Sequence, residues 1–402
     1  MKKITLSLIM LSILMSSYTL YAQVPVKPAH VIVVMEENYA YSEIIGSSLA
    51  PTFTWLSTTP YTANFTQDYA ITHPSEPNYL ELFSGSNQGV TADISGQASN
   101  APFNDCNLGS SLIQHGYTFI GYSEGQPSVG WYAGDNTATY YYTKHCPWIN
   151  WMPYNGNPDT IPLASDIPYS YTAGLYTSGP IFPDSNHYSS LPTVCWVIPN
   201  SVNDMHDNSE SIAIPNGDNW FKTNMMPLVR WASNPANNTV VITTWDEDDG
   251  SHGNNIPLLV SGGKVNGGNY STSLTHYDVL KTIEDMYGLT DCGTSASGID
   301  LPTAIWNVDA GVNSITGNTN EVTTWPVPAK NELNVKITSV ANGNATVGIY
   351  DITGRMVKEI STVLKSGENT IVLNTNDVSN GIYLLSVKGE QISICNKITV
   401  AK

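Results

Sequence analysis

The sequence predicts a large α/β domain followed by a small all-β domain, and three patterns support this division. From residue 28 to about residue 306, near-continuous apolar segments alternate with stretches of helical spacing. This alternation is typical of a mostly parallel sheet with helices on both faces. After residue 320, short alternating segments separated by Asn-Gly and Thr-Gly turns predict a β-sandwich. Residues 307–320, rich in Gly, Asn and Thr, predict a linker.

Individual elements follow from the length and composition of each segment. In the α/β domain (residues 23–306), strands are expected at 30–36, 117–124, 193–200, 239–248 and 256–262, and helices at 219–233 and 276–289. In the C-terminal domain (residues 321–402), strands are expected within 332–339, 345–360, 369–375 and 381–389. Three of the predicted strands run into acidic or Asn-rich tails. Because ligands of open α/β sheets bind beyond the carboxyl ends of strands, we expect a site there.

The N-terminus predicts export. Lys2 and Lys3 precede an apolar run, Ile4 to Met15, that is too short to span a bilayer, and Ala22 lies at a small-residue cleavage site. Residues 1–22 therefore read as a cleaved signal peptide. No other segment is apolar enough to cross a membrane, so the mature chain is expected to be soluble.

Export makes disulfides plausible, because thiols oxidise outside the cytoplasm. Cys106, Cys146, Cys195 and Cys292 lie in the α/β domain and allow three pairings, whereas Cys395 lies near the C-terminus. No CxxC pair is present, which disfavours a zinc ribbon or thioredoxin-like motif. The preferred pairing is Cys106 with Cys146.

The α/β domain and linker are strongly acidic. Residues 23–320 contain 27 Asp and Glu residues but only six Lys and Arg residues: Lys27, Lys144, Lys222, Arg230, Lys264 and Lys281. Such a surface repels nucleic acid and anionic membranes. If the domain handles phosphate, metal ions are expected to supply the positive charge.

Two clusters of candidate site residues lie in the first part of the chain. Glu37 and Asn38 end the first strand and offer oxygen ligands to a hard cation, although a solvated strand-end turn is the alternative. Ser75 precedes the helical sequence NYLELF. Its hydroxyl can cap that helix, or it can act as a nucleophile activated by a metal. The chain has no Gly-x-Ser-x-Gly elbow, which disfavours a lipase-like triad.

Two further clusters follow later strands. The acids from Asp246 to Asp249 come directly after a buried strand and would repel one another without a cation, which favours metal binding over a solvated turn. Asp204 and His206 follow the 193–200 strand, and His276 opens the last helix. One Asp and two His residues suit a transition metal, although His276 by itself is also compatible with a capping or surface role.

These motifs, in this order, resemble the phosphoesterase family of bacterial acid phosphatases and phospholipases C, within the alkaline-phosphatase-like superfamily. The sequences VVMEENYAYSEIIG, THPSEPNYLELFSG, PNSVNDMHD, TTWDEDDG and THYDVLKTIEDMYGL carry the resemblance, which covers residues 29–289. It implies an alkaline-phosphatase-like sheet with helices on both faces. The C-terminal sequences WPVPAKNELNV, VGIYDITGRMVKEI and SNGIYLLSVKG resemble the sorting domain of the type IX secretion system.

The resemblance also implies roles for the candidate residues. Ser75 takes the place of the nucleophile, and one divalent cation is held by four ligands together with the Ser75 hydroxyl: Glu37, Asn38, Asp246 and Glu247. A second metal or the phosphate is held by Asp204, His206 and His276, with the two histidines as further catalytic residues. The oxygen ligands favour Ca²⁺, Mg²⁺ or Mn²⁺, and the histidine-bearing set accepts Zn²⁺.

The predicted function is therefore a secreted or cell-surface, metal-dependent acid phosphatase, exported through the periplasm, that acts on phosphomonoesters through a phosphoserine. Its partners are a phosphate ester or a phospholipid head group and, through the C-terminal domain, the export machinery. A phospholipase C or phosphodiesterase is the first alternative. A non-catalytic surface-binding protein is the second. Aromatic residues at 140–142 and 148–151 line either the mouth of the site or the core.

Overall fold

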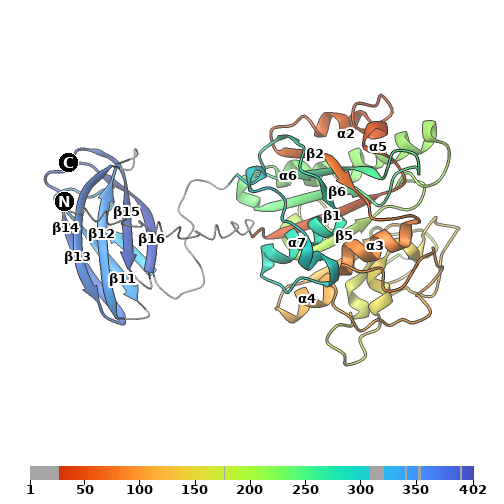
Figure 1. Cartoon of the computed structure of the whole chain (residues 1–402), viewed down its shortest axis with the longest axis horizontal. Coiled ribbons are helices and arrows are strands. Elements are labelled where there is room, and N and C mark those ends of the chain that lie inside the picture. Colours follow the sequence, from red (N-terminus) through yellow and green to blue (C-terminus); the bar gives the residue numbers. More distant parts are fainter. Residues whose placement is uncertain (1–26, 176, 308–320, 340–341, 352–354, 390–391) are drawn as a thin grey trace, which may run out of the picture. The chain divides into compact units, whose positions relative to one another are not determined.

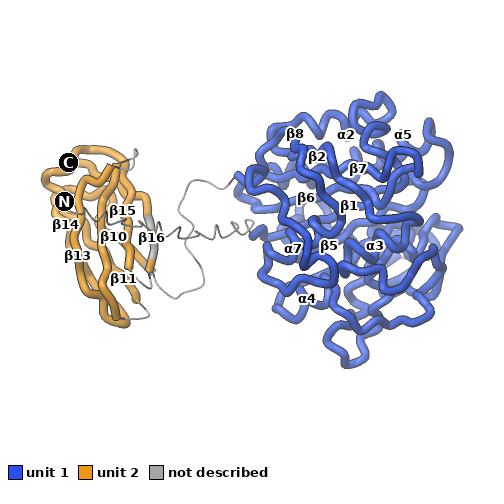
Figure 2. The backbone as a smooth tube through the Cα atoms, viewed as in Figure 1, with its two compact units in different colours: residues 1–307 blue, residues 308–402 orange. Residues whose placement is uncertain are grey.

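The computed structural model describes residues 27–175, 177–307, 321–339, 342–351, 355–389 and 392–402. The predicted signal peptide and nearly all of the predicted linker lie outside these residues. The chain forms two compact units, residues 1–307 and 308–402 (Figure 2). None of the described helices combines the length and apolarity that crossing a membrane requires.

The first unit is built on one nine-stranded sheet of strand order β4-β3-β5-β1-β6-β7-β2-β8, with β9 beside β2 (Figure 1). The strands are β1 (His30–Glu36), β2 (Thr62–Tyr69), β3 (Phe119–Ser123), β4 (Asp166–Pro168), β5 (Val194–Ile198), β6 (Thr239–Trp245), β7 (Asn255–Ser261), β8 (Gly268–Tyr270) and β9 (Leu274–Thr275). The sheet is parallel except for β7, which runs antiparallel to both β6 and β2. The predicted mostly parallel sheet is confirmed, although β2 and the reversed direction of β7 were not foreseen.

Helices cover both faces of the sheet, as predicted (Figure 1). One face carries α2 (Pro51–Leu56), α5 (Glu210–Asn224) and α6 (Met226–Ala232), and the other carries α3 (Ser75–Ser84), α4 (Leu108–Gln114) and α7 (His276–Tyr287). The short helix α1 (Tyr41–Ile44) follows β1. The single helix predicted at 219–233 is wrong. The chain forms two helices that divide at Met225, because Pro227 lies in the first turn of α6 and lacks the N–H that a continuous helix would need.

The alternating side chains of β1 explain why both faces bury apolar helices. Ile32 and Val34 pack with Phe53 and Phe221 under α2 and α5. On the opposite face, Phe83 of α3 contacts Trp196 of β5 at a ring-centroid distance of 5.5 Å. Since both faces of the central strands are fully buried, polar groups gather where those strands end.

The second unit consists of two antiparallel sheets. One contains β10 (Glu321–Trp325), β11 (Glu332–Ser339) and β14 (Gly367–Asn374), and the other β12 (Gly343–Tyr350), β13 (Met356–Leu364), β15 (Gly381–Gly389) and β16 (Ile392–Val400). Leu333 and Val335 from the first sheet pack with Val347 and Val387 from the second. The predicted β-sandwich is confirmed.

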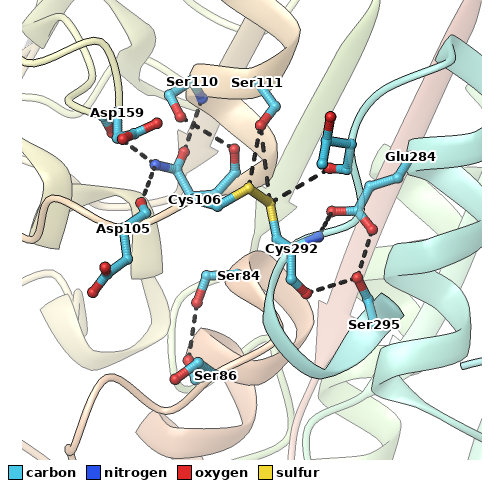
Figure 3. Close-up of a disulfide and its surroundings, with 12 residues drawn as sticks. Ser84, Ser86, Asp105, Cys106, Ser110, Ser111, Asp159, Glu284, Cys292 and Ser295 are labelled. Carbon is cyan, nitrogen blue, oxygen red and sulfur yellow. Dashed lines mark hydrogen bonds between the residues drawn. A yellow bond between two sulfur atoms is a disulfide. The ribbon is translucent and has the colours of Figure 1, made fainter. Parts of the chain in front are cut away.

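A disulfide joins Cys106 to Cys292, so the predicted Cys106–Cys146 pairing is wrong (Figure 3). Cys106 precedes α4 and Cys292 follows α7, and these two helices lie side by side although 186 residues separate the cysteines. Cys146 is instead fully buried, with its Sγ 3.1 Å from the Ser123 hydroxyl. Helix packing, which sequence spacing does not reveal, decides the pairing.

Breaking this disulfide is expected to destabilise the first unit by about 2–4 kcal/mol, because the bridge restricts a long loop of the unfolded chain. Thermal unfolding of the wild type should shift to lower temperature with dithiothreitol. The Cys106→Ser/Cys292→Ser double variant should already have the lower Tm, and dithiothreitol should not change it further. An unchanged wild-type Tm under reduction would contradict this expectation.

Candidate metal and phosphoester site

Three neighbouring strands bring the predicted acidic clusters together. In the sheet, β1 lies between β5 and β6 with all three strands parallel, so their carboxyl ends meet at one edge. The Glu37 N–H donates to the Asp204 carbonyl at 2.7 Å, and the Asn38 N–H donates to Asp246 Oδ1 at 3.1 Å. Segments more than 200 residues apart thus form a single site.

Ser75 faces this site instead of capping its helix. It is the first residue of α3, Pro74 holds the N-cap position, and no side chain caps the helix. The Ser75 hydroxyl lies 3.2 Å from Glu37 Oε2 and 3.3 Å from Glu247 Oε1. The hydroxyl therefore lies between two carboxylates, where a cation can bridge all three groups.

Asn78 fixes the turn that presents Ser75. Its side-chain oxygen accepts hydrogen bonds from the N–H groups of Ile71 and Thr72, and its nitrogen donates to the Thr72 carbonyl at 2.8 Å. The same nitrogen lies 3.2 Å from Glu247 Oε2. One amide thus ties the turn before the nucleophile candidate to the acidic end of β6.

His145 and Tyr79 complete the site, and the sequence reasoning missed both. His145 Nε2 lies 2.7 Å from Glu37 Oε1 and its Nδ1 lies 3.3 Å from Asp204 Oδ2. Tyr79 donates a hydrogen bond to Glu37 Oε1 at 2.8 Å and stacks on the His145 ring. His145 belongs to the short 3₁₀ helix η1 (Thr143–His145), inside the aromatic segment that was weighed only as a mouth or core. The presence of a histidine within that segment was the signal that could have identified it as a site residue.

The donor atoms of this site fit a cation. Those of Glu37, His145 and Asp204 lie within 4.8 Å of one another, and all three residues are buried. Within the described structure, Asp246 Oδ2 is buried without a hydrogen-bond partner, whereas His145 Nε2 and Asp204 Oδ2 have the ion-pair contacts to Glu37 and His145 given above. Buried polar atoms normally have partners, so a partnerless carboxylate oxygen beside this group of donor atoms favours a cation site here.

Electrostatics support the same conclusion. Burial, followed by the charges of Glu37 and Glu247, raises the pKa of Asp246 well above its usual range. Burial and the charge of Glu37 likewise raise the pKa of Glu247 to about 8. Burial alone would also raise the pKa of Glu37, but the charge of His145 lowers it to about 2. Without a cation these acids cannot all ionise, and a divalent cation would allow it.

The predicted histidines occupy different positions. His206 lies close to His145, with 5.8 Å between the ring centroids, and its Nδ1 is 3.0 Å from Asp207 Oδ1.

His276 lies behind Asp246. Its Nε2 is 2.8 Å from the Asp246 carbonyl, and its Nδ1 has no partner among the described residues. Burial lowers the pKa of His276 to about 4. A neutral His276 thus supports the end of β6, while His145 is the histidine grouped with Asp204.

One lysine also reaches the site, which changes the expectation that lysine and arginine take no part. Lys144 Nζ lies 2.8 Å from Asp93 Oδ2 and 3.3 Å from His206 Nε2. Burial alone would lower the pKa of Lys144, but Glu37 and Asp93 raise it, so the amine stays charged.

The site opens into a cleft of about 350 Å³. His73 lies on its wall, with its two ring nitrogens 2.9 Å from Glu247 and 3.2 Å from Asp248. Tyr142 stacks on His206, whereas Trp148 and Trp151 are fully buried, so most of the aromatic segment belongs to the core. The residues that line the cleft are Asn38, Tyr39, His73, Met205, His206, Glu247, Asp248, Asp249 and Gly250.

Residues 52–290 match the model of the Phosphoesterase family. The chain belongs to this family. It is 39% identical over 281 residues to a phosphatidylinositol-3-phosphatase of Mycobacterium tuberculosis, an alignment that covers 69% of this chain and 83% of that protein. It is 28% identical to an acid phosphatase of Aspergillus fumigatus, covering 63% of this chain and 55% of that one. The chain thus spans little more than half of that fungal relative.

Residues 323–401 match the secretion system C-terminal sorting domain. Among solved structures, a protein in the alkaline phosphatase superfamily from Vibrio parahaemolyticus aligns with a TM-score of 0.45 and 14% identity, covering 92% of this chain and 84% of that one. The predicted family, hydrolase class and sorting domain are confirmed. The protein is a phosphoric ester hydrolase that is secreted or displayed at the cell surface.

Metal binding is expected to depend on Asp246. Mn²⁺ added to the chelator-treated wild type should raise Tm. At a free Mn²⁺ concentration of 100 times Kd, binding adds about 2.7 kcal/mol to the free energy of unfolding. Asp246→Asn should lose most of this shift and yet fold, because asparagine keeps the shape of the buried side chain and an oxygen that can accept the Asn38 N–H. Asp184→Asn, in an exposed loop, serves as the control and should respond like the wild type. An equal Mn²⁺ shift in the Asp246 variant would contradict this assignment.

Proposed function

We propose that the protein is a divalent-metal-dependent phosphatase that hydrolyses phosphomonoesters through a phosphoserine intermediate. The observation that supports this most directly is the Ser75 hydroxyl, held between Glu37 and Glu247 at the carboxyl ends of β1 and β6. Hydrolysis of a phosphoester through a covalent intermediate needs a nucleophilic side chain, and among the described residues of the site Ser75 is the hydroxyl that contacts both Glu37 and Glu247.

In the proposed reaction, Ser75 Oγ loses its proton to a neighbouring carboxylate and attacks phosphorus. The bond from phosphorus to the substrate alcohol breaks, and the departing oxygen takes a proton from water in the open cleft, because His206 Nε2 faces the charged amine of Lys144. Water then cleaves the phosphoserine, which releases phosphate and restores the hydroxyl. Asn78 keeps Ser75 in line throughout by holding its turn.

The bound cation would be held by Glu37, Asn38, Asp246 and Glu247 together with Ser75, and it would supply Lewis acidity that lowers the pKa of the hydroxyl. These oxygen ligands favour Mg²⁺, Mn²⁺ or Ca²⁺. For a second ion we revise the ligand set to Glu37, His145 and Asp204, which suits Zn²⁺. His276 then acts by supporting Asp246 from behind.

The relatives favour monoesters over the phospholipase C alternative. Both the phosphatidylinositol-3-phosphatase and the acid phosphatase are named for removing a terminal phosphate. A phosphoinositide head group is accordingly the first lipid substrate to test, beside small soluble monoesters.

Replacing the nucleophile should abolish turnover. Ser75→Ala is expected to reduce kcat for p-nitrophenyl phosphate by at least about 10³-fold, with Tm and the Mn²⁺ shift nearly retained. Ser84→Ala is the matched control, because Ser84 is a buried serine of the same helix whose hydroxyl bonds only to backbone carbonyls and Gln88. Turnover by Ser75→Ala at the wild-type rate would refute the nucleophile.

Substrate preference is tested with a panel. The wild type should release phosphate from p-nitrophenyl phosphate and from phosphatidylinositol 3-phosphate in vesicles. It should be at least about tenfold slower in kcat/KM on bis-p-nitrophenyl phosphate, and it should release no diacylglycerol from phosphatidylcholine. Faster diester than monoester turnover would support a phosphodiesterase instead.

A further inference from the structure

Lys144 occupies an unusual position for so acidic a domain. It lies in η1, directly before His145, and only 8% of the residue is exposed. Its amine contacts Asp93 on one side and His206, on the cleft wall, on the other. Among the lysines and arginines described in residues 27–307, Lys144 is the one with a hydrogen bond or ion pair to a side chain of the site. Lys281, by contrast, pairs with Asp285 and Asp291.

Asp93 fixes this amine relative to the nucleophile. One Asp93 carboxylate oxygen accepts a hydrogen bond from the Lys144 amine. The other oxygen accepts one, at 3.0 Å, from the backbone N–H of Glu76, the residue after Ser75. The Glu76 side chain in turn accepts the Ile94 N–H at 2.6 Å. The segment around Asp93 therefore links the start of α3, where Ser75 lies, to Lys144 in η1.

A monoester and a diester differ in what they need from such a group. Near neutral pH a phosphomonoester carries a charge of roughly −1.5 to −2 and three non-bridging oxygens, whereas a diester carries one charge and two such oxygens. The wall of the cleft includes Glu247, Asp248 and Asp249, which repel the additional charge. A monoester therefore gains more than a diester does from a cationic side chain that acts beside the proposed metal ion.

We propose that Lys144, held by Asp93, binds the third non-bridging oxygen of a phosphomonoester and so makes the enzyme selective for monoesters over diesters. This inference rests on the proposed function. An amine is suited to this task because it donates up to three hydrogen bonds from a compact charge.

The test compares Lys144→Met, which keeps length but removes charge, with Lys144→Arg, which keeps charge. Lys144→Met should lower kcat/KM for p-nitrophenyl phosphate by about 10²-fold but change bis-p-nitrophenyl phosphate turnover by less than about threefold. It should also weaken competitive inhibition by inorganic phosphate by at least about tenfold, a readout that needs no diester turnover. Lys144→Arg should recover part of both losses, and Lys281→Met, the control, should match the wild type.

Equal losses on both ester classes would overturn the proposal, because they would indicate a general structural role. Unchanged phosphate inhibition in Lys144→Met would overturn it as well, whichever substrates are hydrolysed. Failure of the proposed function gives a different result: the wild type itself would then hydrolyse neither ester, or would prefer the diester. The Mn²⁺-induced shift in Tm, measured on each variant, confirms that the metal site is intact.

Discussion

Mutual repulsion among buried carboxylates is the constraint on which the site depends. Glu37, Asp246 and Glu247 follow two adjacent parallel strands; Glu37 and Asp246 are fully buried, and Glu247 is nearly so at the wall of the cleft. Burying such charges unpaired is expensive, so the fold requires positive charge at this edge. His145 supplies part of it through Glu37. The partnerless Asp246 Oδ2 marks where further positive charge would be accommodated.

In the proposed reaction, the same constraint explains why the nucleophile can be a serine. A hydroxyl is a poor nucleophile at neutral pH, and carboxylates alone activate it weakly. Placed between Glu37 and Glu247, however, the Ser75 oxygen would share the ion that we propose for those acids. Repulsion among the buried carboxylates thus accounts for their raised pKa values and, in the proposed reaction, for the activation of the Ser75 hydroxyl.

The sequence was most informative for features that depend on neighbouring residues along the chain. Near-continuous apolar strands predicted the sheet, and the acids that follow three of them predicted its functional edge. Contacts set by packing were not readable: the partner of Cys106, the reversal of β7, and the approach of η1 to Glu37. His145 was missed because no periodicity links residue 145 to the ends of β1 and β5. Lys144 was missed for the same reason, since a low count of cations does not reveal where the few are placed.

In the proposed mechanism, adjacent residues of η1 serve different parts of one reaction. A 3₁₀ turn directs neighbouring side chains apart, so His145 reaches the buried carboxylates while Lys144 reaches the cleft wall at His206. The first balances charge that belongs to the protein, and the second meets charge that arrives with the substrate. An acidic cleft repels anions in general. It binds an anion only when that anion accepts a hydrogen bond from the one fixed amine, as the third oxygen of a phosphomonoester does. Selectivity here follows from scarcity of positive charge, and a more basic cleft would bind phosphate esters of either class.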